Sequence, residues 1–508
     1  MNPVVETAHG RLEGRRERGV ESFKGIPFAA PPVGPLRFTP PQPAAPWTGS
    51  RDCGSYGPVS LQHTDPLSIW IPGCEWNYYT PDVRKNEDCL NLNVWTPACD
   101  DGKRAVYVWL HGGGFVTGSG TALWYDGTNL AAGEDVVVVT VNYRLGALGG
   151  LVLEDAAARA NTMLLDQIAA LQWVRTNIEA FGGDPARVTL GGESAGGIAV
   201  CALMAAPEAH GLFRAAAVQS GHGGFTLARE RAGHVRATFL AALGLADDGG
   251  ASKSLRELHA AHILDAQAET TATIAFPFRP VDDGDVLPAP IDEAFASGSA
   301  AQVPLLIGTN RNEHNLFAAL GIRQRRGLRE EIAATLVDDD PETVDELTDT
   351  YAALAATDAE AWNIAATERD WRSPVRELAA AHADRGAEVF QYEFALPSPV
   401  RDGVLGASHA MALAYTFGNL DQPGVAQFTG DDAENPNRKQ AQQACVEAWG
   451  SFIRDGRPAS ERLPHWPAYS RRDRDVMVID AAARVERDPN GRRVGRWAEL
   501  ETTTALDG

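Results

Sequence analysis

The feature that most constrains the fold of this chain is a glycine-rich corner between an apolar extended segment and a helix-forming segment. Residues 188–191 read Val-Thr-Leu-Gly, residues 192–196 read Gly-Glu-Ser-Ala-Gly, and residues 198–205 read Ile-Ala-Val-Cys-Ala-Leu-Met-Ala. A strand that turns directly into a helix forces the corner residue, here Ser194, into strained backbone angles, and flanking side chains would clash. The pattern therefore predicts a sharp turn that holds the Ser194 hydroxyl above the end of a sheet.

This corner matches the G-x-S-x-G pattern of a nucleophilic serine, and it is the only match in the 508 residues. A helix N-terminus behind Ser194 would favour developing negative charge. The alternative is an ordinary glycine-rich turn, since the chain contains 50 glycines. The strand before the turn and the helix after it favour a catalytic serine.

Composition and charge exclude several other classes of protein. The formal net charge is −22, which disfavours nucleic acid and anionic membrane surfaces as partners. The longest apolar run, near residues 136–141, is too short to span a membrane, and the first twenty residues hold four arginines and no apolar core. The six cysteines lack metal-ligand spacing. For the chain as given, we expect a cytoplasmic protein.

Extended apolar segments alternate with helical ones along much of the chain. The predicted strands are 90–95, 105–110, 136–141, 187–191, 215–219, 303–308, 388–395 and 475–479, and helices are predicted over 166–180 and from 440 onward. This alternation implies an α/β fold with a mostly parallel, doubly wound sheet covered by helices on both faces. We expect one domain over 1–508, with mainly helical insertions around 226–300 and 316–385. Residues 53–88, rich in turn formers and aromatics, predict a long ordered loop that walls a pocket.

A nucleophilic serine needs a base, normally histidine, and an acid that fixes the tautomer of that histidine. With this type of turn, both partners follow the serine on loops after strands, the acid first. His409 lies in the small-residue loop Gly-Ala-Ser-His after the predicted strand 388–395, so we expect it to be the base; the alternative is a surface loop histidine. Glu313, five residues past the strand that ends at Gly308, is the expected acid.

Two sets of neighbours compete with these choices. Asp282, Asp283 and Asp285 are rival acids, but they precede the strand and resemble a turn. His314 directly follows Glu313 and is interpreted as a bystander.

A glycine-rich loop, His-Gly-Gly-Gly-Phe at 111–115, follows the predicted strand 105–110. Acyl transfer needs main-chain amides that stabilise a tetrahedral oxyanion, and glycine lets the backbone approach the substrate closely. We expect two such amides from this loop and a third from the residue after the nucleophile.

Together these segments resemble the type-B carboxylesterase family, which includes the cholinesterases and the bacterial p-nitrobenzyl esterases. The shared motifs lie nearly end to end, at 23–29, 35–38, 87–94, 111–115, 142–144, 165–167, 181–185, 192–197, 308–313 and 406–409. The resemblance implies an α/β-hydrolase fold and no cofactor. It also implies a triad of Ser194, Glu313 and His409 and an oxyanion hole formed by the amides of Gly113, Gly114 and Ala195.

The same resemblance implies structural ion pairs and a substrate pocket. The ion pairs would join Arg37 to Glu87 and Arg144 to Asp166. The acyl side of the pocket would be shaped by Ile274 and Phe276, and we expect Phe115 beside the substrate as well.

The chain departs from the family pattern at one disulfide. Cys89 is present, but Ser60 occupies the position of its usual partner. Two alternatives stay open, a bond to Cys74 or a free thiol, and the second fits a reducing cytoplasm. The chain shows no clear match to the choline-binding tryptophan of cholinesterases.

These observations predict a serine esterase that acts on small or medium carboxylic esters through an acyl-enzyme. One alternative is a hydrolase of aryl carbamates or amides that uses the same triad. A more remote one is a non-catalytic adhesion or scaffold relative. The expected partner is a small-molecule ester, and the oligomeric state, monomer or dimer, is left open.

Overall fold

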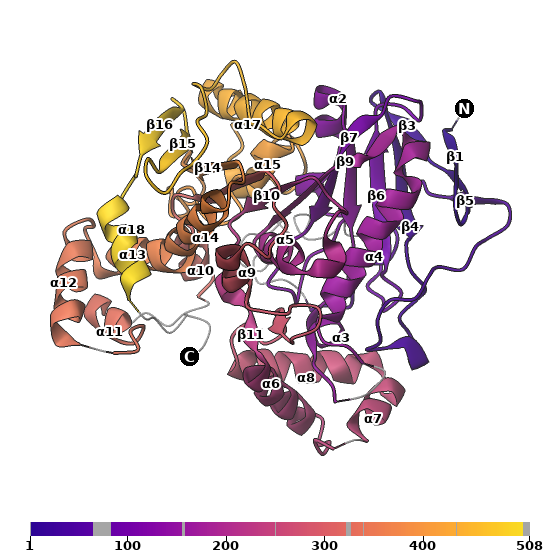
Figure 1. Cartoon of the computed structure of the whole chain (residues 1–508), viewed down its shortest axis with the longest axis horizontal. Helices are drawn as coiled ribbons and strands as arrows, with labels where there is room; N and C mark the ends of the chain where they lie inside the picture. The colour runs from indigo at the N-terminus through magenta and orange to yellow at the C-terminus, as the bar shows by residue number, and fades with distance from the viewer. Residues whose placement is uncertain are drawn as a thin grey trace.

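A large mixed sheet organises the molecule in the computed structural model, which describes residues 2–63, 83–154, 158–248, 250–321, 327–338, 340–432 and 434–500 (Figure 1). Among these residues the sheet has eleven strands. Their spatial order is β16 (Arg484–Arg487), β15 (Asp475–Ile479), β14 (Val389–Phe394), β13 (Leu305–Asn310), β10 (Ala215–Gln219), β9 (Gly183–Glu193), β7 (Arg104–Leu110), β8 (Val137–Val141), β6 (Asn91–Thr96), β4 (Val20–Pro27) and β3 (Arg15–Glu17).

The strands from β15 to β8 pair in parallel, and the outer strands β16, β6, β4 and β3 pair antiparallel with their neighbours. The chain runs from β7 outward to β8 and then returns to form β9 on the other side of β7. In such sheets a ligand binds where the strand order reverses, beyond the carboxyl ends of the strands. The ends of β7 and β9 therefore mark the expected location of a site.

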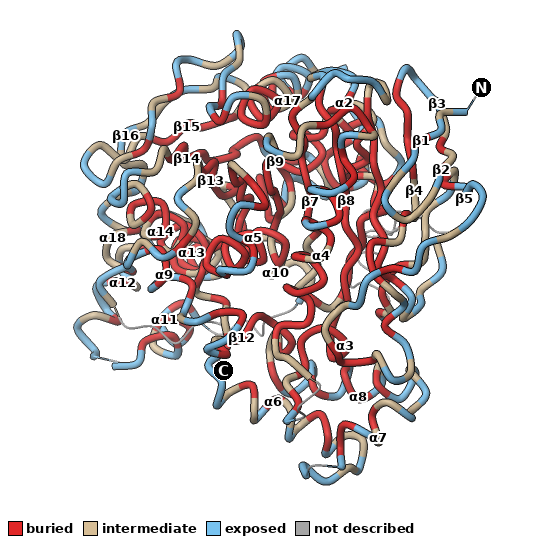
Figure 2. The backbone as a smooth tube through the Cα atoms, turned by 45° about the vertical axis from the view of Figure 1, so that its right-hand side comes forward, coloured by how far each residue is buried: buried red, intermediate tan, exposed pale blue. Residues whose placement is uncertain are grey.

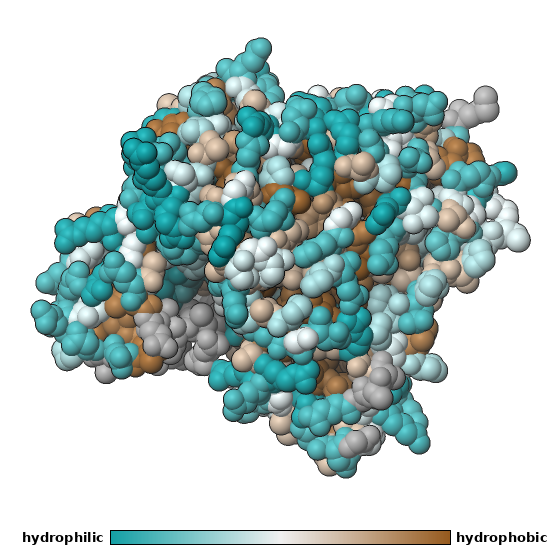
Figure 3. Space-filling model, viewed as in Figure 1, coloured by the Kyte–Doolittle hydropathy of each residue, from teal (hydrophilic) through white to brown (hydrophobic). Residues whose placement is uncertain are grey.

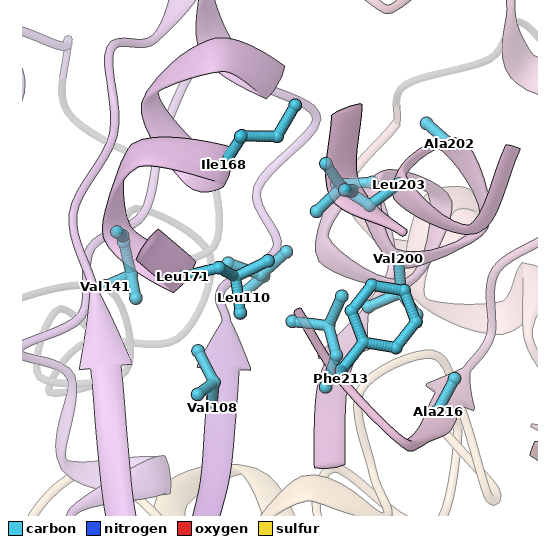
Figure 4. Close-up of a cluster of buried hydrophobic side chains, with 14 of the residues drawn as sticks. Val108, Leu110, Val141, Ile168, Leu171, Val200, Ala202, Leu203, Phe213 and Ala216 are labelled. Atoms are coloured by element: carbon cyan, nitrogen blue, oxygen red, sulfur yellow. The ribbon is translucent and has the colours of Figure 1, made fainter. Parts of the chain in front are cut away.

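Alternate residues of each central strand belong to different hydrophobic clusters, because successive side chains of a strand point to opposite faces. In β7, residues Val106, Val108 and Leu110 join one cluster, whereas Tyr107 and Trp109 join the other. Figure 4 shows part of the first cluster, and Figure 2 shows buried backbone concentrated along these strands and the helices that pack on them.

Helices cover both faces of the sheet. The face that carries Val108 packs against α4 (Thr162–Asn177), α5 (Ala195–Ala205), α9 (Ile291–Ser297) and α14 (Ser373–Asp384). The face that carries Trp109 packs against α2 (Thr128–Glu134), α15 (Leu413–Thr416) and α17 (Pro436–Asp455). This arrangement is the predicted doubly wound α/β architecture.

Two further groups of helices extend from the sheet, at the bottom and left of Figure 1. The lower group contains α6 (Arg229–Ala242), α7 (Ala251–Glu257) and α8 (Ala260–Thr273). The left-hand group contains α11 (Leu328–Ala333), α12 (Pro341–Ala352), α13 (Asp358–Thr367) and α18 (Gly491–Glu499). The shorter elements are β1 (Val4–Thr7), β2 (Gly10–Glu13), β5 (Ser50–Asp52), α3 (Gly146–Gly150), β11 (Leu227–Ala228), β12 (Val281–Asp282), α10 (His314–Ala319) and α16 (Ala426–Thr429).

The predicted strands all form, with changes at their ends. The strands at 215–219 and 475–479 have the predicted bounds, but β9 spans 183–193 and β13 extends to Asn310. Glu313 therefore follows its strand by three residues and not five. The helix predicted at 166–180 begins at Thr162 and ends at Asn177, where a 3-10 turn follows. Within the loop predicted over 53–88, residues 64–82 lie outside the described residues, so its role stays a prediction.

Both predicted ion pairs form; the pair of Arg144 and Asp166 is fully buried, and the pair of Arg37 and Glu87 is partly buried. Arg144 contacts the two carboxylate oxygens of Asp166 at 2.8 and 2.6 Å, and the Asp166 side chain is 0% exposed. Arg37 contacts the two oxygens of Glu87 at 2.6 and 2.7 Å. Cys89 is a buried free thiol, which is the second of the two alternatives; Cys74 lies outside the described residues.

The surface in Figure 3 is mostly hydrophilic, as expected for a chain of net charge −22. Over the described ranges, no helix is both long enough and apolar enough to span a bilayer.

The buried pair of Arg144 and Asp166 supports a stability prediction. Asp166→Asn leaves the guanidinium buried without its counter-charge, so we expect the free energy of unfolding to fall by about 3–5 kcal/mol. Urea unfolding followed by circular dichroism measures the change. The control is Asp345→Asn, because Asp345 pairs with Arg329 while 62% exposed, and such pairs contribute about 1 kcal/mol or less. Equal losses in the two variants would contradict the prediction.

Candidate active site

Ser194 occupies the corner between β9 and α5 in the strained conformation that the sequence predicts. Its φ is 55° and its ψ is −125°, in a region that non-glycine residues rarely adopt. A Cβ atom on Gly192 would lie 2.3 Å from the Gly196 carbonyl oxygen, and one on Gly196 would lie 2.0 Å from the Leu110 carbonyl oxygen. Only glycine fits at these two positions. The backbone N–H of Ser194 donates to the Gln219 carbonyl at 3.0 Å, which ties the corner to β10.

Glu313 and His409 meet directly although 96 residues separate them in the chain. The Nδ1 atom of His409 lies 2.7 Å from the Oε2 atom of Glu313, and the Glu313 side chain is 0% exposed. The other carboxylate oxygen, Oε1, accepts hydrogen bonds from the backbone N–H of Asn310 at 2.6 Å and from the Ser220 hydroxyl at 2.5 Å. These donors fix the carboxylate, and the carboxylate in turn fixes the imidazole with Nδ1 toward it.

The opposite nitrogen of the imidazole faces the strained corner. The Nε2 atom of His409 lies 3.2 Å from Oε1 of Glu193, the residue immediately before Ser194. Neither atom has a hydrogen-bond partner within the described part of the chain, so this contact is close but poorly aligned. The structure thus brings Glu313 and His409 into a hydrogen bond and places His409 beside the corner, without a hydrogen bond from the Ser194 hydroxyl to Nε2.

Two carboxylates therefore flank one imidazole in a buried site. Burial raises the pKa of Glu193 to about 7; the nearby His409 opposes this rise and Glu313 adds to it. Burial lowers the pKa of His409, but the charges of Glu193 and Glu313 outweigh it, so the net pKa of His409 is raised. A protonated His409 is the form that this pair of carboxylates stabilises.

The predicted oxyanion loop lies against the same corner. A Cβ atom on Gly112 would lie 3.1 Å from the Cβ atom of Ser194 and 2.8 Å from the Glu193 carbonyl oxygen. Gly113 and Gly114 have φ values of 108° and 61°, both in the range that favours glycine. Ala195 is the first residue of α5, directly after Ser194. The three predicted amide donors thus belong to two segments that adjoin at Ser194.

The predicted pocket residues differ in their surroundings. Phe276 packs near the oxyanion loop, because a Cβ atom on Gly114 would lie 3.1 Å from its ring. Ile274 is 6% exposed and belongs to a cluster with α6 and α8. Phe115 is 2% exposed and belongs to the large core cluster that also contains Ala195. The contribution of these residues to substrate binding stays a prediction.

The competing residues have other contacts. Asp285 pairs with Arg159, while Asp283 accepts hydrogen bonds from the backbone of its own turn. Asp282 accepts a hydrogen bond from Thr226. The ring of His314 packs against Trp362 and Phe317.

Three residues near His409 escaped the sequence reasoning as functional residues. Ser220 holds Glu313, Glu193 faces Nε2, and Trp371 packs its ring 4.6 Å from the imidazole centroid. Ser220 directly follows the predicted strand 215–219, so its position at the carboxyl edge of the sheet was a usable signal. Trp371 lies in a helical segment with no such signal. Across the described ranges, no group of three or more His, Cys, Asp or Glu side chains could hold a metal ion.

The sheet topology and the serine corner define an α/β hydrolase, and comparison with known proteins narrows the class. A carboxylesterase family model matches residues 1–497. The chain is 36% identical to the para-nitrobenzyl esterase of Bacillus subtilis (strain 168), covering 96% of this chain and 97% of that protein. It is 34% identical to the phenmedipham hydrolase of Pseudarthrobacter oxydans, covering 96% and 97%.

Solved structures agree with this assignment. A PNB esterase structure superposes with a TM-score of 0.87 at 35% identity, covering 98% of this chain and 99% of that chain. The Geobacillus stearothermophilus carboxylesterase gives a TM-score of 0.85 at 38% identity, covering 97% and 99%. The chain belongs to the carboxylesterase family and is a carboxylic ester hydrolase of the type-B serine esterase class.

The contact between Glu193 and His409 predicts a change in pH dependence. A base must be neutral to accept a proton, so esterase activity rises with pH through the pKa of His409. Because the charge of Glu193 helps to raise that pKa, we expect Glu193→Gln to lower it and to move the acid limb of kcat/KM to lower pH. Rates on p-nitrophenyl acetate between pH 5 and 9 measure the limb. Glu434→Gln, at an 87% exposed position, is the control; a limb that stays in place in Glu193→Gln would contradict the prediction.

Proposed function

We propose that Ser194 is the nucleophile, His409 the general base and Glu313 the acid that orients it. The observation that carries this assignment is the 2.7 Å hydrogen bond between His409 and Glu313, with the opposite imidazole nitrogen 3.2 Å from Glu193, the residue just before Ser194. The strained backbone at Ser194 supports it, because such corners hold a nucleophilic hydroxyl clear of the sheet.

In the proposed acylation step, the Ser194 oxygen attacks the carbonyl carbon of the ester while its proton passes to Nε2 of His409. The carbonyl oxygen becomes an oxyanion that the amides of Gly113, Gly114 and Ala195 stabilise. Collapse of this intermediate breaks the bond to the alcohol oxygen, which takes the proton from Nε2. Glu313 stays ionised throughout and stabilises the imidazolium.

Deacylation repeats these steps with water as the nucleophile. His409 accepts a proton from the water as it attacks the acyl carbon, and then returns a proton to the Ser194 oxygen as the carboxylic acid leaves. The second carboxylate, Glu193, adds negative charge beside Nε2 and so favours the protonated intermediate states of His409.

The proposed substrates are small or medium carboxylic esters. Phe276 beside the oxyanion loop supports an apolar wall on the acyl side, and Ile274 is proposed as a second part of this wall. Aryl carbamates or amides remain a second candidate class. The names of the relatives support a broad range of substrates, since they include a para-nitrobenzyl esterase and a phenmedipham hydrolase.

We also propose that the protein works in the cytoplasm. The supporting observation is that Cys53, Cys89, Cys201 and Cys445 are buried free thiols and Cys99 is a partly buried one. Free thiols are typical of a reducing compartment.

Replacement of the proposed nucleophile gives a direct test. We expect Ser194→Ala to lower kcat on p-nitrophenyl butyrate by about 10⁴-fold or more, because no other group supplies the attacking oxygen. The same variant should lose covalent labelling by a fluorophosphonate probe, which also distinguishes an esterase from a non-catalytic relative. Ser299→Ala, at an exposed serine, is the control and should keep both properties. Full turnover by a folded Ser194→Ala protein would refute the assignment.

A matched pair of substrates separates the two candidate classes. We expect phenyl butyrate to turn over faster than the phenyl carbamate of the same size, because the carbamate nitrogen donates electrons to the carbonyl and slows both attack and deacylation. Steady-state and burst kinetics on the two compounds measure this difference. Faster steady-state turnover of the carbamate would reverse the order of the two proposals.

A further inference from the structure

A π turn (Glu368–Arg372) joins α13 to α14 next to the proposed base. The backbone N–H of Ser373 donates to the Glu368 carbonyl, five residues back, where an α-helix would use a four-residue step. Pro374 follows and has no N–H, so the Asp370 carbonyl loses its α-helical donor. That carbonyl lies 2.8 Å from the Nε2 atom of His222 instead. Such π turns occur frequently at functional sites.

The π turn presents Trp371 to the imidazole of His409. The ring centroids lie 4.6 Å apart with an angle of 44° between the planes, and Trp371 is 6% exposed. Phe317 lies 5.0 Å from the same imidazole and stacks on Trp371 at 5.9 Å with an interplanar angle of 5°. Two stacked aromatic rings therefore contact the imidazole and limit its movement.

A buried carboxylate holds the start of the π turn. Glu368 is 0% exposed, and Arg493 of the C-terminal helix α18 contacts its two oxygens at 2.8 and 3.2 Å. The Tyr351 hydroxyl of α12 donates to Glu368 at 2.8 Å, and the guanidinium of Arg372 lies 3.2 Å from the Glu368 carboxylate. In Figure 1, α18 lies beside α12 and α13. The C-terminal helix is thus linked to the π turn by charge.

The other end of the π turn is attached to the sheet. Arg372 pairs with Glu393 of β14 at 2.8 Å and donates to the Arg311 carbonyl, just beyond β13, at 3.1 Å. Arg311 is two residues from Glu313. The turn therefore bridges the C-terminal helix and the loop that carries the proposed acid.

We propose that Trp371 is a positioning residue for His409, and that the Arg493–Glu368 ion pair holds the π turn in the register that places Trp371 against the imidazole. This inference rests on the proposed role of His409. A shift of one residue in the turn rotates the following side chains by about 100° around the helix axis, which would remove Trp371 from the imidazole. The C-terminal helix thereby influences catalysis from outside the site.

The test compares variants of the full chain on p-nitrophenyl acetate. We expect Trp371→Ala to lower kcat by about 10- to 100-fold, because small misplacements of a catalytic group have effects of this size, and Trp371→Phe to recover most of the loss. Without the indole, water reaches the imidazole and favours its charged form, so the acid limb of kcat/KM should move to higher pH in Trp371→Ala.

Arg493→Ala should also lower kcat and move the acid limb of kcat/KM to higher pH, but by less than Trp371→Ala. Arg493→Lys should restore part of the lost kcat and part of the shift in the limb. The matched control is Arg496→Ala, because Arg496 also joins α18 to α12, through Glu346, without contacting the π turn. Thermal unfolding of each variant separates a loss of stability from a loss of positioning. If Arg493→Ala fails to fold, Arg493→Lys and Trp371→Phe carry the comparison.

Wild-type kcat and an unmoved acid limb in folded Trp371→Ala would overturn the positioning role. Equal effects of Arg493→Ala and Arg496→Ala would overturn the role of the ion pair. Ser194→Ala and His409→Ala in the same assay distinguish these failures from a failure of the proposed function. Turnover that survives in either variant refutes the triad itself. Inactive Ser194→Ala and His409→Ala variants, together with a fully active Trp371→Ala, refute only the positioning role of Trp371.

Discussion

The strained corner at Ser194 is the constraint on which the rest of the structure depends. A non-glycine residue with a φ of 55° and a ψ of −125° costs about 1–3 kcal/mol, and it persists only where its surroundings hold it. Here β9 lies between β7 and β10, a Cβ atom on Gly192 or Gly196 would clash with backbone carbonyl oxygens, and the Ser194 N–H is hydrogen-bonded to β10. The sheet supplies the energy that keeps the corner strained, and the same packing brings the loop after β7 against Ser194.

Three buried carboxylates, Glu313, Glu368 and Glu193, have different partners, and these partners decide what each carboxylate can do. Glu313 receives two hydrogen bonds on one oxygen and the imidazole on the other. Glu368 is surrounded by two guanidinium groups and a hydroxyl. Glu193 has a buried oxygen without a hydrogen-bond partner, and burial raises its pKa to about 7. The hydrogen-bond donors and guanidinium groups around Glu313 and Glu368 compensate the cost of burying a carboxylate, whereas Glu193 can exchange a proton near neutral pH.

Much of the sheet follows from the sequence because its central strands are apolar, β-branched and bounded by glycine or proline. Two elements near the C-terminus, β16 and α18, do not follow from the sequence. β16 reads Arg-Val-Glu-Arg, and its pairing with β15 at the sheet edge gives little apolar pattern. α18 contains three arginines and buries Val494 and Trp497, and Trp497 packs in a cluster with helices far away in the chain. β13 also extends beyond the predicted end at Gly308, because its pairing with β14 continues to Asn310 opposite Phe394. For α18 and for the end of β13 the missing information is a contact with a distant segment, whereas β16 pairs with its neighbour in the chain and simply lacks an apolar pattern.

By itself, the sequence determined the features that depend on backbone sterics. Glycines at 192 and 196 specify the corner, glycines at 113 and 114 permit the loop beside it, and Pro374 frees the Asp370 carbonyl within the π turn. The candidate acid and base could also be chosen from their places after strands. Only the tertiary structure decided which atom meets which: Nδ1 of His409 with Glu313, Nε2 with Glu193, and the imidazole with Trp371. The physical reason is that these contacts join segments that lie far apart in the chain. How close the segments come, and how deeply their side chains are buried, depends on how the whole sheet and its helices pack.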